Sequence, residues 1–431
     1  MDIRVLSKTA LKYLAAYVAL LAAFVGAMTL VSALPNERIQ RNIINSVIDM
    51  DEEDIRNVMF GVPQSTLDGF TDRVMAEVQF KIDPSSPFES AIVIHRDSVH
   101  DFASLHNILR AMDGHPFEGN YARYWHGYTV WLRPMLVFMT YTQTRIPMNI
   151  IFYGLVTAVL ALLYWRTRKW QALLPPIFAL MAAFFLVIPM SWQYFSVYLI
   201  ALGMSVFILA RFKSEAFVGK LPLVMFVTGA LTSFMDLLTV PLVTMAFPLF
   251  IALMVIYCHK YADFYKLRGV AFLVLRMCVA WGVGYVALWA SKWVMADVFF
   301  SLGIIGEFLT KSTELTYADP TLTTVGRIVL RLPMSAFTHT FGQLSWPVFI
   351  ASLAAIAFVV WQAVKRKDVG LWAMLAVGLV PAVWYWVIFI HSWVHMYMVF
   401  RNVSIFIMAV SCAALCAFWN MDEKRRRKMR R

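Results

Sequence analysis

The sequence predicts an all-α, polytopic membrane protein with about ten transmembrane helices, and its composition and its apolar runs carry that prediction. Of the 431 residues, 60% are hydrophobic and only 15% are charged, whereas soluble domains carry about a quarter charged residues. The apolar runs approach the roughly 20 residues that a helix needs to cross a bilayer while satisfying its own backbone. We expect spans at residues 11–33, 147–165, 171–189, 194–211, 220–235, 239–258, 268–291, 345–364, 370–390 and 397–419.

Basic residues divide the loops between these spans into two classes. Lys and Arg gather in alternate loops, and the three short loops near Ser191, Met235 and Ser392 contain none. The basic stretches are 166–169, 211–220, 260–268, 365–367 and the tail 424–431. Because basic loops stay on the cytoplasmic side, both termini are expected in the cytoplasm. The net charge of +12 follows this topology and does not predict a nucleic-acid partner.

The first apolar run is interpreted as an uncleaved signal-anchor, because it is longer than the apolar part of a cleaved signal peptide. The topology then divides the chain into six segments. They are the cytoplasmic N-terminus and first span (1–33), an extracytoplasmic loop with interfacial amphipathic helices (34–146), a transmembrane bundle (147–291), a second extracytoplasmic loop (292–344), C-terminal transmembrane helices (345–419) and a basic cytoplasmic tail (420–431).

Reactive residue types concentrate on the predicted outer side, where eight of the nine histidines fall. One group, just before the second span, holds Arg123, His126 and Arg133 among aromatic residues. Aromatic residues at this depth can form a mere interfacial belt. Guanidinium groups also present the paired donors that bind phosphate, so the segment is a candidate anion site as well.

The last outer loop and the start of the last span form a second group. His391 and His395 lie four residues apart, which places them on one face of a helix. A third metal ligand is not evident nearby, so a hydrogen-bonding pair beside a phosphate or sugar is favoured, and no cofactor is predicted. Arg401 lies in an apolar span, where a charge requires a partner or a ligand. Asp236, at the outer end of the fifth span, either pairs with Arg401 or Arg133 as a structural lock or contacts a ligand.

Two groups of carboxylates in the first outer loop are candidate general bases. Asp72 lies in a weakly charged stretch and is the sharper candidate. Asp51 and Glu52 belong to the acidic run 49–54, which is more typical of a solvated helix face.

With these features the chain resembles the GT-C superfamily of polytopic glycosyltransferases. The likeness is architectural: a short inner N-terminus, one span, a long first outer loop with acidic residues, then further spans. Segments 70–72, 123–128 with 132–134, and 391–401 also look like patterns in bacterial membrane proteins of this type. The resemblance implies a GT-C-like fold in the bacterial inner membrane and a polyprenyl-phosphate-linked sugar as donor.

Carried onto this sequence, the resemblance implies Asp72 as the base, with Asp51 or Glu52 as its rival. It gives the donor phosphate to Arg123, Arg133 and Arg401. His126, His391 or His395 would neutralise that phosphate or bind sugar. No Asp-Glu pair directly follows the first span, as it does in some members, so the identity of the base stays open.

The sequence thus predicts a glycosyltransferase that moves a sugar from a lipid-phosphate donor to an envelope glycan or lipid acceptor, among membrane lipids. An envelope acyltransferase with His126 or His391 as base is an alternative. A lipid or solute transporter or flippase is another, and it should show interrupted spans near the middle of the membrane. A divalent metal is possible in any of these, but no motif supports one.

Overall fold

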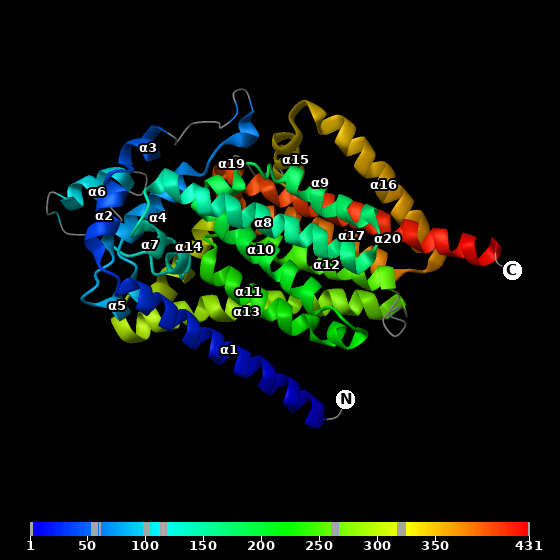
Figure 1. Ribbon diagram of the computed structural model, residues 1–431, viewed down its shortest axis with the longest axis horizontal. Helices are drawn as coiled ribbons and strands as arrows, with labels where there is room; N and C mark the ends of the chain where they lie inside the picture. Colours follow the sequence, from blue (N-terminus) through cyan, green and yellow to red (C-terminus); the bar gives the residue numbers. More distant parts are fainter. Residues whose placement is uncertain are drawn as a thin grey trace.

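The computed structural model describes residues 3–52, 59, 62–97, 104–112, 115, 119–259, 267–316 and 325–429. Within these ranges the chain is helical, with one isolated bridge between His95 and Asn120. Nine stretches in the described residues are helices long and apolar enough to cross a membrane. The chain is therefore an all-α, polytopic membrane protein, as the sequence predicts, and Figure 1 shows an elongated bundle.

The spanning helices are α1 (Ile3–Ser32), α8 (Tyr141–Thr167), α10 (Trp192–Arg211), α11 (Leu221–Met235), α12 (Leu242–His259), α13 (Leu267–Phe300), α16 (Ser345–Arg366), α17 (Val369–Val387) and α20 (Val403–Met429). α12 lies at the centre and is the most completely buried of them, since 89% of its most apolar stretch is buried inside the protein. α1 is its opposite: only 17% of its most apolar stretch is buried, and Figure 1 shows its N-terminal half leaving the bundle. Both helices are strongly apolar by sequence, so the difference in burial comes from their neighbours in the bundle.

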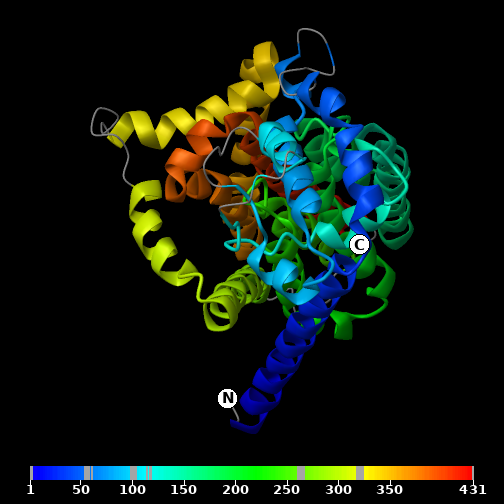
Figure 2. The same ribbon diagram turned by 90° about the vertical axis from the view of Figure 1, so that its left-hand side faces the viewer.

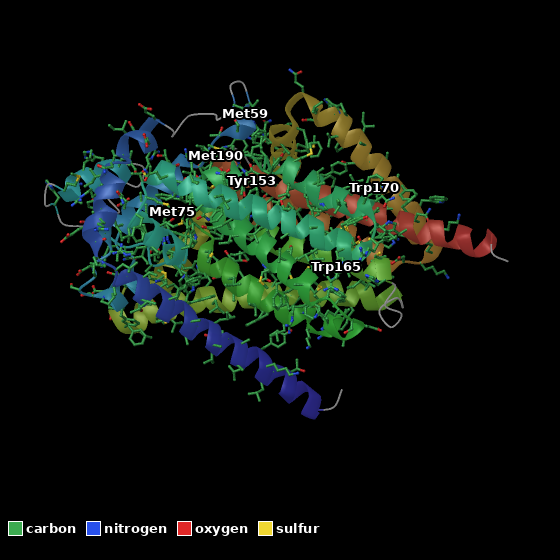
Figure 3. The ribbon with its side chains drawn as sticks, viewed as in Figure 1. Met59, Met75, Tyr153, Trp165, Trp170 and Met190 are labelled. Carbon is green, nitrogen blue, oxygen red and sulfur yellow. The ribbon has the colours of Figure 1, made fainter. Side chains whose placement is uncertain are left out.

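The predicted span 171–189 is interrupted. The 3-10 helix η2 (Trp170–Leu173) continues into α9 (Leu174–Ala182), five residues then form turns, and η3 (Ile188–Met190) follows. Phe184 has a positive φ of 55°, which ends the regular helix. Trp170 and Met190 nevertheless lie toward opposite ends of the bundle (Figure 3). The segment is thus a broken crossing, and the described residues contain nine continuous spans instead of about ten.

Most of the first outer loop folds against one end of the bundle, which we call the loop end. Its helices are α2 (Asn36–Ile44), α3 (Val47–Glu52), α4 (Gly69–Lys81), α5 (Pro87–Val93), α6 (Ser104–Met112) and α7 (Thr129–Leu136). Figure 2 looks onto this end, and the two chain termini point the other way in Figure 1. Ile39 and Ile43 of α2 are fully buried against the main core. The loop is therefore part of the packed protein, and its predicted orientation parallel to the membrane stays a prediction.

The region predicted as a second outer loop is largely helical. α13 extends through the first residues of this predicted loop and ends at Phe300. The helices α14 (Ile304–Thr316) and α15 (Val325–Phe341) follow. Lys292 is fully buried, and its Nζ donates to Ala91 O (3.0 Å) and Ile92 O (2.6 Å) at the end of α5. Free carbonyls at a helix C-terminus favour a cation. Lys292 therefore connects the C-terminal part of α13 to the helices at the loop end.

Candidate functional site

Asp72 lies in the first turn of α4 and is only 1% exposed. Its carboxylate accepts four hydrogen bonds, from Tyr141 Oη (3.0 Å), Ser191 Oγ (3.1 Å), Trp192 N (3.2 Å) and Gln193 N (3.3 Å). The last two amides open α10, whose N-terminus attracts negative charge. Asp72 therefore caps α10 from a helix of the outer loop and fixes the loop end onto the bundle.

Burial raises the pKa of Asp72, and the nearby charge of Asp68 raises it further. The hydrogen bonds from Tyr141 and Trp192 act in the opposite direction and do not cancel the effect of burial. A raised pKa suits a general base. A base must also have an oxygen that can reach the substrate, and both oxygens of Asp72 are held by protein donors. The local geometry thus favours a positioning role for Asp72.

Gln193 connects Asp72 to Asp236. Its backbone amide binds Asp72, and its side-chain Nε2 donates to Asp236 Oδ1 (3.1 Å). The same oxygen accepts from Thr239 N (3.0 Å). Asp236 is 2% exposed, and its second oxygen, Oδ2, has no hydrogen-bond partner in the described ranges. Burial raises the pKa of Asp236, and the opposing backbone hydrogen bonds from Thr239, Val240 and Leu238 do not cancel that effect. This carboxyl therefore has a raised pKa and one buried oxygen, Oδ2, without a partner among the described residues.

Arg401 lies in η7 (Phe400–Asn402), the short helix before α20, and is fully buried. Its Nη1 donates to Tyr397 O (3.1 Å), and its Cζ lies 3.9 Å from the centre of the Tyr194 ring. Its Nε and Nη2 find no acceptor in the part of the chain that the structure describes, and the side-chain nitrogen and oxygen of Asn402 likewise have no hydrogen-bond partner there. Burying a guanidinium without an anion is costly. The two donors without an acceptor in that part of the chain make Arg401 a candidate anion-binding residue.

Asp236 and Arg401 do not hydrogen-bond to each other, so the lock considered from the sequence is not formed. Two consecutive residues of α10 connect them instead: Gln193 holds Asp236, and Tyr194 stacks under Arg401. The first turn of α10 therefore contacts both a carboxylate and a guanidinium, through neighbouring side chains.

His391 and His395 complete this cluster. Their rings are 4.7 Å apart, and His391 Nε2 lies 3.1 Å from Leu238 O in the loop that carries Asp236. The His395 ring faces Phe70, two residues before Asp72, at 6.2 Å. Both histidines are half-buried. No group of three or more His, Cys, Asp or Glu side chains that could hold a metal is found in the described residues.

Arg133 is also fully buried, but at a different place. Its guanidinium donates to Val31 O (2.9 Å), Leu34 O (2.9 Å), Gln79 O (3.0 Å) and Asn36 Oδ1 (3.0 Å). These acceptors belong to the end of α1, the start of α2 and α4. Arg133 therefore joins α7 to three other segments, and its donors are already occupied.

His126 and Arg123 lie on the α13 side of the loop end. His126 is fully buried, with Nδ1 2.8 Å from Tyr128 Oη and Nε2 3.1 Å from Tyr121 O. Since a carbonyl can only accept, Nε2 carries the proton and both ring nitrogens are engaged. Arg123 is one-third exposed and lies 3.9 Å from Glu307. The three residues that the sequence analysis grouped as one anion site thus have different surroundings. Arg133 and His126 make structural hydrogen bonds, and Arg123 is partly exposed.

The carboxylates of the acidic run lie elsewhere. Asp51 and Glu52 are the last residues of α3, and both are exposed. Asp49, in the same helix, accepts from Thr142 Oγ1 at 3.3 Å. Residues 53–58, the rest of the run and beyond, lie outside the described residues. The solvated-face interpretation fits this exposure better than the role of base.

Sequence reasoning missed Gln193 and Tyr194, which organise the cluster. Their only signal is a polar residue and a tyrosine at the start of an apolar span. It also missed a buried network in which Lys81 pairs with Glu77 at 2.8 Å and Arg96 lies 3.6 Å from the same carboxylate. That network holds α4 to the segment before α6, and its members look like ordinary loop charges in the sequence.

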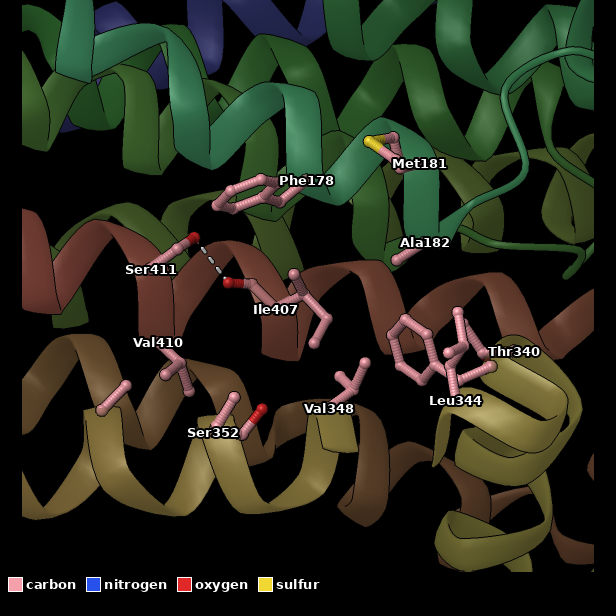
Figure 4. A pocket seen from close by; sticks show the side chains of 13 residues that line it. Phe178, Met181, Ala182, Thr340, Leu344, Val348, Ser352, Ile407, Val410 and Ser411 are labelled. Carbon is pink, nitrogen blue, oxygen red and sulfur yellow. Dashed lines mark hydrogen bonds between the residues drawn. The ribbon is translucent and has the colours of Figure 1, made fainter. Parts of the chain in front are cut away.

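An apolar groove lies beside the broken crossing and runs between α9, α16 and α20 (Figure 4). Its volume is about 550 Å³. The lining side chains are mostly apolar, and they include Phe178, Met181, Phe341, Val348, Ile407 and Val410. Its α15 end, at Phe341, is two residues from His339, whose ring packs 4.6 Å from Phe400. His339 and Phe400 thus lie between this end of the groove and Arg401.

No protein-family model, curated protein or solved structure matches this chain. The resemblance to the GT-C superfamily therefore rests on the sequence features alone.

Proposed function

We propose that the protein transfers a sugar from a polyprenyl-phosphate-linked donor to a cell-envelope acceptor at the loop end of the bundle. In this proposal the loop end faces the outside of a bacterial inner membrane, and both termini are cytoplasmic. The observation that carries it is Arg401, a fully buried guanidinium with two unused donors. Guanidinium groups bind phosphate oxygens through paired hydrogen bonds, and an anion at this place would offset the cost of burying the charge.

The apolar groove supports a lipid-linked donor. Its lining matches a hydrocarbon chain, and His339 and Phe400 lie between its α15 end and Arg401. A prenyl chain in the groove would place its phosphate at the polar cluster. A soluble nucleotide-sugar donor would leave this groove without a role.

Asp236 is the base that the geometry supports best. Its free Oδ2 would accept the proton of an acceptor hydroxyl, and the hydroxyl oxygen would form a bond to the anomeric carbon of the donor sugar. The bond from that carbon to the phosphate oxygen breaks, and the phosphate leaves with the electron pair. Arg401 stabilises the negative charge that develops on the leaving group. Asp72, the base implied by the resemblance, would hold Gln193 and Tyr194 in place.

The test uses purified protein in lipid nanodiscs and measures binding of a polyprenyl phosphate by native mass spectrometry. Arg401→Met removes the unused donors and keeps an apolar volume, and it should weaken binding at least tenfold. Arg123→Met, at a partly exposed arginine outside the cluster, is the matched control and should bind normally. Equal binding by the wild type and Arg401→Met would contradict the phosphate assignment. Transfer from a panel of polyprenyl-phosphate sugars, lost in Asp236→Asn, then tests the base.

A flippase or transporter is the second candidate, and the broken crossing favours it. Interrupted helices beside a binding site are typical of transporters, and the break after Ala182 lies at the apolar groove. The two functions differ in chemistry. A transporter in proteoliposomes would move a labelled polyprenyl-phosphate sugar across the bilayer unchanged, whereas the transferase would pass its sugar to the acceptor and leave the free lipid phosphate.

A further inference from the structure

A second cavity, of about 640 Å³, lies at the other side of the α15 end. The 3-10 helix η1 (Pro63–Ser65) and the last residues of α15 form its walls. The side chains that carry polar groups into it are Gln64, Ser335, Thr338, His339 and Gln343. None of the described residues that line it is Lys, Arg, Asp or Glu. Its polar chemistry therefore consists of amides, hydroxyls and one imidazole.

The cavity adjoins both parts of the proposed donor site. Phe341 lines this cavity and the apolar groove alike. His339 lines the cavity, its ring lies 4.6 Å from the Phe400 ring, and that ring centre is 4.5 Å from Arg401 Cζ. A ligand in the cavity would therefore lie next to the phosphate and the sugar of a donor held at Arg401.

The walls of the cavity are held in place by contacts within the protein. Gln64 donates to His339 O, which joins η1 to α15. Gly342, at a φ of +53°, directly follows α15 and begins the 3-10 helix η6 (Gly342–Leu344). His339 Nε2 is buried and has no hydrogen-bond partner among the residues that the structure describes. The wall is therefore fixed by protein contacts, and Gln64, Ser335, Thr338 and Gln343 carry its polar side chains beside the imidazole ring.

We infer that this cavity binds an uncharged, hydroxyl-rich group, the carbohydrate part of the acceptor. Amides, hydroxyls and imidazole all exchange hydrogen bonds with sugar hydroxyls, because each of them offers a donor or an acceptor. A phosphate or a carboxylate would require cationic groups, and an amine would require carboxylates. The volume lies in the range of small-ligand sites. The identification of this carbohydrate as the acceptor rests on the proposed function.

The test introduces a reactive thiol into the cavity. Thr338→Cys lies on the exposed part of its lining, and its modification by a water-soluble methanethiosulfonate is timed with and without added sugars. Neutral disaccharides and trisaccharides should slow the reaction, about tenfold at ten times the dissociation constant, because only the free fraction reacts. Uronic acids and sugar phosphates of similar size should protect weakly. Thr310→Cys, exposed on α14, is the control that no sugar should protect, and the unmodified chain gives the background of the native cysteines.

A second measurement uses kinetics with the transfer reaction. Ser335→Ala and Gln343→Ala should each raise KM for a glycan acceptor about fivefold, as expected for one hydrogen bond, with KM for the donor unchanged. Absence of protection by every neutral sugar, or stronger protection by the charged ones, would overturn the inference.

The two proposals fail in different experiments. If a polyprenyl phosphate binds through Arg401 while neutral sugars do not protect Thr338→Cys, the cavity assignment is wrong and the proposed function stands. If sugars protect the thiol but no polyprenyl phosphate binds, the cavity is a carbohydrate site in a protein with another activity.

Discussion

Arg133 and Arg401 are both fully buried at the loop end, but their surroundings differ in one respect. Arg133 has an acceptor for the donors on all three of its nitrogens, in α1, α2 and α4. Arg401 has backbone acceptors for Nη1 alone and rests on an aromatic ring. The comparison teaches that burial of a charge does not identify a ligand site by itself. The hydrogen bonds that the protein leaves unmade are what distinguish the two arginines.

The largest expected effect is structural and concerns Arg133. Arg133→Met removes the side-chain donor from the carbonyls of Leu34 and Gln79, whereas Val31 O keeps the amide of Leu34 as a donor. Each orphaned group costs about 1–3 kcal/mol, so the loss of stability should be about 4 kcal/mol. Thermal unfolding in detergent, followed by tryptophan fluorescence, measures it. An unchanged unfolding temperature would show that water or lipid reaches these carbonyls.

Arg401→Met should have the opposite pattern. Transfer should fall about hundredfold, the usual cost of removing one donor that stabilises a developing negative charge. Stability should stay level or rise, because an apolar residue replaces a buried, uncompensated cation. The measurement pairs a transfer assay with thermal unfolding of the same preparation. Loss of stability comparable to that of Arg133→Met would erase the distinction between the two arginines.

Asp72→Asn sharpens the comparison through pH. Burial raises the pKa of Asp72, so between the ordinary carboxyl pKa and the raised value the folded protein binds a proton that the unfolded chain has lost. The stability of the wild type therefore falls, through this group, as the pH rises across that window. Asn cannot titrate, so across this window the free energy of unfolding of the variant should rise relative to that of the wild type, by about 1.4 kcal/mol per pH unit.

Unfolding curves of both proteins across this pH window test the sign. A wild type that gains on Asp72→Asn with rising pH would mean that the ionised carboxylate caps α10 better than the buried acid does.

Asp51→Asn should have the smallest effect. Its side chain is exposed at the end of α3, and exposed substitutions usually change stability by less than about 0.5 kcal/mol. Transfer should stay at the wild-type level in the same assay that reports on Arg401→Met. A loss of transfer would return the role of base to the acidic run.

The sequence was sufficient for the parts that hydropathy decides. It predicted the spans other than the broken one, because twenty apolar residues have few alternatives to a membrane helix. It could not predict the break after Ala182, because its apolar residues fit a continuous span equally well. The end of α13 was missed for a related reason: Lys292 looks like a loop residue until its contacts with Ala91 and Ile92 are seen.

For the candidate site, the sequence indicated which residues are costly to bury but not how they are paired. His391 lies beside His395 and against the loop that carries Asp236, while Asp236 and Arg401 contact the neighbouring residues Gln193 and Tyr194 of α10. Arg133 and His126 were equally good candidates by type and depth. Only the tertiary contacts show that their polar atoms are already used, and only those contacts bring Gln193 and Tyr194 into the site.

The contact between Arg133 and Val31 also has a consequence for biosynthesis. Chains are made from the N-terminus, so α1 enters the bilayer first, yet the donor that fixes its end is synthesised 102 residues later. Between those two moments the carbonyls at the end of α1 have no protein partner from α7. The attachment of α1 is therefore a late step of assembly, completed only after the segment between α1 and α7 has been made and has folded back.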